Sequence, residues 1–109
     1  MSLSVDTFRA FVSRLAARPG MWIGPSPTVR KFAAAIAGYE AALRDADVLP
    51  GNEPIPSWQF GQWLATQWHV SSVVGWETHV AERFGDDEAG IAEAAKLMAQ
   101  WFLSRDDRP

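Results

Sequence analysis

The chain has 109 residues, 48% of them hydrophobic, and a formal net charge of −3, which is typical of one soluble globular domain. It contains no cysteine, which excludes disulfides, thiolate metal sites and cysteine nucleophiles, and favours a cytoplasmic location. The sequence has no signal-peptide pattern at its start and no apolar run near the ~20 residues of a membrane span, so we expect neither secretion nor a membrane partner.

The first predicted helix covers residues 5–18, with Ser4 as its N-cap and Pro19-Gly20 ending it. Its apolar residues recur at helical spacing and define one buried face. They are Val5, Phe8, Phe11, Val12 and Leu15.

The next segment, residues 17–27, contains three prolines and two glycines together with three large apolar side chains. An ordinary surface connection is small and polar. We therefore predict a loop of fixed shape that folds back onto the core through Met21, Trp22 and Ile23, with Trp22 largely buried.

A second helix is predicted over residues 27–46, with Ser26 as its cap and Pro27 at its first position. Its inner stripe is Val29, Phe32, Ile36, Tyr39 and Leu43. Glu40 lies within or at the edge of this stripe, where an unpaired carboxylate is costly. We expect it to accept a hydrogen bond from a backbone amide or an indole N–H near the Trp22 loop. The alternatives are a catalytic carboxylate of raised pKa and simple exposure at the helix edge.

A linker at residues 49–56 precedes a third predicted helix, residues 57–69, which Ser57 would cap. Its apolar arc contains Phe60, Leu64 and Trp68, with Trp63 at the edge. Trp58 points the other way, so it either covers the linker or lies on the surface. Tryptophan is a common anchor of protein interfaces, which makes Trp58 a candidate partner-binding residue.

Two more helices are predicted: one at residues 72–84, and one that Asp86 or Asp87 caps and that runs to residue 104, with residues 105–109 as a frayed tail. Their inner residues are Val73, Trp76, Val80, Phe84, Ile91, Ala94, Ala95, Met98, Trp101 and Phe102. No segment alternates with period two long enough to build a sheet. The sequence therefore predicts an all-α, single-domain bundle of about five helices with antiparallel neighbours.

The distribution of charge argues against a nucleic-acid partner, because the basic residues are scattered and only Arg30 and Lys31 are adjacent. Acidic residues gather in the second half of the chain. An acidic surface suits a basic protein partner. The candidate partner-binding residues are Trp58, Glu82, Asp86, Asp87 and Glu88.

An alternative is a small-ligand or anion-binding domain, or a minor enzyme, centred on the loop at residues 20–28 and on Glu40. Free amides at a helix start, with Thr28, Arg30 and Lys31 nearby, could hold an anion. The simpler interpretation is that both cations point to solvent.

The two histidines, His69 and His79, are too few for a zinc site, which needs at least three protein ligands. Ser71 and Ser72 lie near them in sequence but lack a nucleophile elbow. We therefore expect no metal, no cofactor and no catalytic residues.

The stretch Arg18-Pro19-Gly20-Met21-Trp22-Ile23-Gly24 resembles the Arg-Pro-Gly-Met-Tyr-Ile-Gly stretch of the ATPase domains of type II DNA topoisomerases. In those proteins the next helix carries a Glu and an Asn-Ala pair that handle the nucleotide and its magnesium. Here that helix has no asparagine and no acidic residue before Glu40, and the glycine-rich ATP lid is missing. We expect no nucleotide hydrolysis.

A wider resemblance spans about residues 8–102. The same motif lies between an amphipathic helix and a helix containing Gly38-Tyr39-Glu40; a Trp-rich helix, an acidic turn and an Ala-rich helix ending in aromatics follow. This order resembles small bacterial immunity-like proteins associated with polymorphic toxin systems. The resemblance implies a non-enzymatic protein that binds and blocks a toxin, and it transfers no active-site residue.

Overall fold

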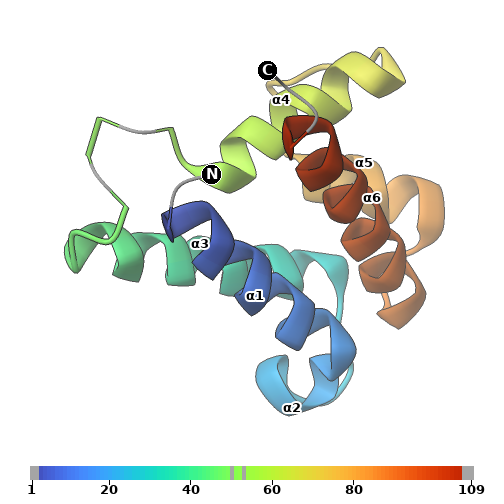
Figure 1. The fold of residues 1–109 in the computed structure, drawn as a ribbon. Helices are drawn as coiled ribbons and strands as arrows, with labels where there is room; N and C mark the ends of the chain where they lie inside the picture. The colour runs from blue at the N-terminus through green and yellow to red at the C-terminus, as the bar shows by residue number, and fades with distance from the viewer. Residues whose placement is uncertain (1–2, 50, 53, 107–109) are drawn as a thin grey trace.

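The structure, a computed structural model, describes residues 3–49, 51–52 and 54–106. Those residues form six α-helices and no strand, which confirms the predicted all-α class (Figure 1). The helices are α1 (Leu3–Ala17), α2 (Pro19–Ile23), α3 (Val29–Asp45), α4 (Pro56–Trp68), α5 (Trp76–Phe84) and α6 (Glu88–Asp106).

One hydrophobic core joins five of the six helices, so the bundle is a single domain. α6 packs against α1, α3, α4 and α5, and α3 also contacts α2. In Figure 1, α1 and α3 run in roughly opposite directions, and α5 and α6 lie together beside them. The core residues follow the predicted stripes: Phe8, Val12, Leu15, Val29, Phe32, Ile36, Phe60, Leu64, Trp76, Val80, Ile91, Ala94, Met98, Trp101 and Phe102.

The segment after α1 differs from the prediction, because residues 19–23 form one helical turn. Pro19 and Ile23 are four residues apart and take its inner side, and Ile23 packs against the core. Met21 and Trp22 are thereby turned outward and are 71% and 49% exposed. The prediction that Trp22 is largely buried is therefore wrong. The rings of Trp22 and Phe11 still form an edge-to-face contact, with centroids 6.4 Å apart.

The start of α3 also differs from the prediction. Thr28, not Ser26, is the N-cap, and its hydroxyl accepts a hydrogen bond from the Lys31 amide at 3.1 Å. Pro27 lies outside the helix. Ser26 cannot act as an extended N-cap because its backbone has a positive φ of 56°.

Two further helix starts are corrected. α4 begins at Pro56, one residue earlier than predicted, and Ser57 lies inside its first turn, bonded to Glu40. α5 begins at Trp76 rather than at residue 72, so Val73 lies in the preceding loop and is 94% exposed. Phe84, predicted to point inward, is also exposed, although its ring contacts Trp68.

The turn between α5 and α6 brings helix ends together closely. Gly85 ends α5 with a φ of 102°, a conformation that L side chains rarely adopt. Of the two predicted caps, Asp87 caps α6, because its Oδ1 accepts a hydrogen bond from the Gly90 amide at 3.1 Å. α6 extends beyond residue 104 to Asp106, and Arg105 lies in its last turn. Residues 107–109 of that predicted tail lie outside the described residues.

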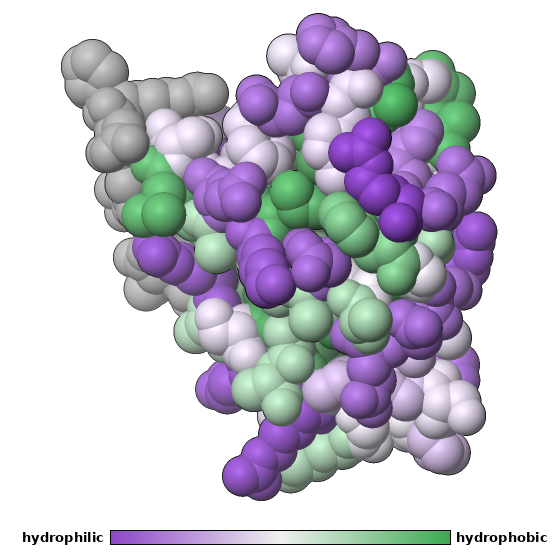
Figure 2. Space-filling model, turned by 90° about the vertical axis from the view of Figure 1, so that its right-hand side faces the viewer, coloured by the Kyte–Doolittle hydropathy of each residue, from purple (hydrophilic) through white to green (hydrophobic). Residues whose placement is uncertain are grey.

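The surface on the side of α5 and α6 is mixed: Figure 2 shows small apolar areas between polar side chains there. Within the described residues, none of the helices combines the length and apolar character that crossing a bilayer requires.

Candidate functional site

Trp58 lies in the first turn of α4 and is 59% exposed. The buried face of α4 is formed by Pro56, Phe60 and Leu64, which recur every four residues. Trp58 is two residues from both Pro56 and Phe60, so the helical period of 3.6 places it on the opposite face. The structure thus decides between the two predicted positions in favour of the surface.

Trp58 stands between two grooves. The first, which we call the α3–α4 groove, has a volume of about 490 Å³ and is formed by one face of α3 and the start of α4. Its apolar walls include Ala37, Ala41, Ile55 and Trp76. The second, the α4–α6 groove, has a volume of about 520 Å³. Both volumes lie within the range of small binding sites.

The α4–α6 groove is lined by the rings of Trp58, Trp63 and Trp101 and by polar side chains of α4 and α6. Arg105 lies over the Trp101 ring, 5.1 Å from its centroid, and donates a hydrogen bond to Gln59 Oε1. These contacts hold the guanidinium in one place. The sequence does not indicate this pair, because 46 residues separate its members.

Glu40 is the one charged side chain in the buried core of the described residues, with 3% exposure, and it borders the α3–α4 groove. Its Oε2 accepts a hydrogen bond from the Ser57 amide at 2.7 Å, and its Oε1 accepts one from the Ser57 hydroxyl at 2.5 Å. The prediction of a backbone-amide partner is confirmed, although the amide belongs to α4 and not to the Trp22 loop. The carboxylate therefore fixes the start of α4, next to Trp58.

Burial raises the pKa of Glu40 above its ordinary value of 4.5. The hydrogen bonds from Ser57 and the positive charge of Arg44 oppose that rise. Desolvation dominates because almost no water reaches the carboxylate.

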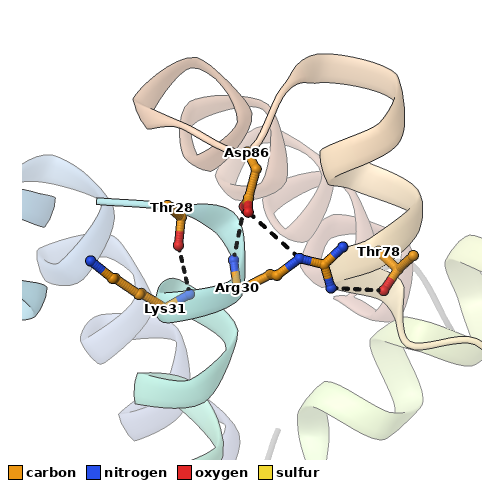
Figure 3. Close-up of polar contacts among 5 residues, drawn as sticks. All are labelled: Thr28, Arg30, Lys31, Thr78 and Asp86. Atoms are coloured by element: carbon orange, nitrogen blue, oxygen red, sulfur yellow. Dashed lines mark hydrogen bonds and ion pairs between the residues drawn. The ribbon is translucent and has the colours of Figure 1, made fainter. Parts of the chain in front are cut away.

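Arg30, a candidate anion-binding residue, is in contact with Asp86, a candidate partner-binding residue (Figure 3). Asp86 Oδ1 accepts a hydrogen bond from the Arg30 amide at 3.2 Å, and Asp86 Oδ2 lies 3.5 Å from Arg30 Nε. A carboxylate of the chain itself thus occupies the start of α3, where the sequence suggested an external anion. Arg30 also donates to the Thr78 hydroxyl at 3.3 Å, and Lys31 Nζ donates to the Ser26 carbonyl at 3.2 Å.

The acidic candidate residues consequently divide into two pairs. Asp86 and Asp87 hold helix starts, since Asp86 binds Arg30 and Asp87 caps α6. Glu82 and Glu88 are exposed on α5 and at the start of α6. Glu82 and Glu88 therefore present their charge to solvent, as a surface that attracts a basic partner would.

The histidines have local structural contacts. His69 ends α4 in the left-handed conformation, with φ of 55°. His79 Nε2 lies 2.9 Å from the Ser71 carbonyl, and the Ser71 hydroxyl accepts a hydrogen bond from the Val73 amide. Across the residues that the structure describes, no group of three or more His, Asp or Glu side chains is placed to hold a metal ion.

Comparisons of the chain with protein-family models, with curated proteins and with solved structures found no match. The interpretation of the site therefore depends on its geometry and its charges.

Proposed function

We propose that this protein is a non-enzymatic protein-binding domain whose contact surface centres on Trp58. The observation that carries the proposal is the exposure of this indole, 59%, between two grooves. Tryptophan supplies a large, rigid contact area and is enriched among the residues that dominate binding energy. Glu40 holds the start of α4, the helix that presents Trp58. Little conformational entropy of this segment would therefore be lost on binding.

The partner that fits the charge of this chain is a basic protein. The chain carries a net charge of −3, and Glu82 and Glu88 are exposed. Charges of this kind contribute little to folding, but they accelerate and orient the encounter with an oppositely charged partner. The resemblance to immunity-like proteins supports a more specific proposal, in which the partner is a toxin domain neutralised in the cytoplasm of a bacterial cell.

The alternative function, binding of an external anion by Thr28, Arg30 and Lys31, has less support. Asp86 already satisfies the Arg30 amide and lies beside its guanidinium (Figure 3). An external anion would have to displace this carboxylate. The Trp58 surface requires no such displacement, and we favour it for this reason.

Site-specific cross-linking tests the proposal. Trp58 is replaced by the photoreactive p-benzoylphenylalanine, and the protein is irradiated in cells of its native host. Trp22, the other strongly exposed tryptophan, receives the same replacement as a matched control. We expect a covalent product with one protein of basic net charge from position 58 and not from position 22. A product from position 22 alone would contradict the proposal.

The contribution of charge is tested on the captured partner. Glu82→Lys combined with Glu88→Lys should slow association at low salt, where screening is weakest, and leave the melting temperature nearly unchanged. Asp86 and Asp87 are unsuitable for this test because they hold helix starts. An unchanged association rate would show that this acidic surface does not face the partner.

A further inference from the structure

The α3–α4 groove is lined by more acidic than basic side chains. The charged side chains that line it are Glu40, Arg44 and Asp45. Arg44 acts on Glu40 already, since its positive charge lowers the pKa of that carboxylate. Asp45 is exposed at the end of α3. Among these described lining residues two carboxyl groups accompany one guanidinium, and the exposed one is Asp45.

The walls of the same groove suit a long side chain that ends in a cation. Ala37, Ala41 and Ile55 provide an apolar path, along which the methylene stem of a lysine or arginine can lie. The exposed indole of Trp58 borders this path. Indole rings attract ammonium and guanidinium groups, and carboxylates bind them through charge-assisted hydrogen bonds. The groove thus combines an apolar path, an indole ring and a carboxylate, the three features that recognise such a side chain.

We propose that the α3–α4 groove receives an arginine or lysine side chain of the basic protein partner, with Asp45 and Trp58 binding its head group. This inference rests on the proposed function, and it names the chemistry by which the partner is recognised. Charge complementarity selects this occupant, because the groove presents an exposed acidic side chain, Asp45, together with the exposed aromatic ring of Trp58.

The test uses the full chain and a hexa-arginine peptide, with hexa-glutamate as the control peptide. Binding is followed by the NMR signals of the Trp58 indole and the Ser57 amide. We expect hexa-arginine to shift these signals and hexa-glutamate to leave them unchanged. Asp45→Asn should weaken hexa-arginine binding about threefold, the size of one exposed ion pair. Glu93→Gln removes the same charge from α6, outside the lining of the groove, and should change the affinity by much less.

Three results would overturn the inference. One is the absence of any shift at Trp58 and Ser57, and another is an equal loss of affinity in Asp45→Asn and Glu93→Gln, which would indicate non-specific attraction. The third is binding of free arginine amide as tight as that of hexa-arginine, which would indicate a small-molecule site. A fourth result would overturn the inference and leave the proposed function standing. If the partner cross-links at position 58 but its affinity is insensitive to Asp45→Asn, the partner surface stands and the cation pocket does not.

Discussion

The carboxylate of Asp86 lies over the start of α3 and accepts a hydrogen bond from the Arg30 amide, 56 residues away in sequence (Figure 3). The first amides of a helix have no partner within the helix, and the helix dipole favours a negative charge there. Asp86 therefore joins the α5–α6 turn to α3.

Replacing Asp86 should measure this connection. Asp86→Ala leaves the Arg30 amide without its acceptor and should lower the free energy of unfolding by about 1 kcal/mol, as loss of a helix cap does. Asp86→Asn keeps an acceptor oxygen and loses only an exposed ion pair, so its effect should be smaller. Urea unfolding of both variants is the measurement. Equal losses of unfolding free energy would show that the ion pair with Arg30 dominates, and not the hydrogen bond from the Arg30 amide.

Glu40 should make stability depend on pH. Because its pKa is raised in the folded protein, the folded state binds the proton more tightly than the unfolded chain does. Its contribution to stability is fully present below pH 4.5 and is lost as the pH rises through the folded pKa. The wild-type protein should therefore gain stability relative to Glu40→Gln as the pH falls from 7 toward 4.5. Urea unfolding at a series of pH values measures this difference, and a difference of opposite slope would contradict it.

Glu40→Ala is the control for that comparison. Gln retains an oxygen for the Ser57 amide and an N–H for the Ser57 hydroxyl, whereas Ala leaves both Ser57 groups without this partner. Glu40→Ala should cost about 2 kcal/mol at pH 7, the penalty of an unmade buried hydrogen bond. Glu40→Gln should cost clearly less.

Gly90 permits the close approach of α6 to α3. A Cβ at this position would collide with the Gly85 carbonyl and lie 2.6 Å from Val29 Cγ2. Gly90→Ala should therefore cost about 2 kcal/mol, as overpacking does, despite the better helix propensity of alanine. Gly38 lies in exposed, open space in α3, so Gly38→Ala should instead gain up to about 1 kcal/mol. Thermal and urea unfolding of both variants measure these changes in stability. A Gly90→Ala variant as stable as the wild type would contradict the close approach of α6 to α3.

The buried faces could be predicted from sequence because helical periodicity is a local property. Phe8, Phe32 and Phe60 are all fully buried, as their spacing indicates. The cap of α6 at Asp87 was also predictable, because it depends on a side chain and an amide three residues apart.

The predictions failed where the position of a side chain depends on tertiary packing or on a short element that the sequence pattern did not indicate. A single helical turn at residues 19–23 turns Trp22 outward, and proline and glycine content alone suggested a loop. Val73 has the spacing of an inward residue but lies before the start of α5. For the site, the outward face of Trp58 followed from the helical wheel. The partner of Glu40 did not, because Ser57 meets it only through the packing of α4 on α3.

The most direct test of the central claim is the affinity of the captured partner for Trp58→Ala, measured by calorimetry beside Trp22→Ala. Both side chains are strongly exposed, so both variants should keep nearly the wild-type melting temperature. A tryptophan that anchors an interface contributes about 2 kcal/mol or more, so Trp58→Ala should weaken binding roughly 30-fold or more. Trp22→Ala should change the affinity by less than about threefold. Unchanged affinity in Trp58→Ala, with the protein folded, would contradict the claim that Trp58 is the centre of the binding surface.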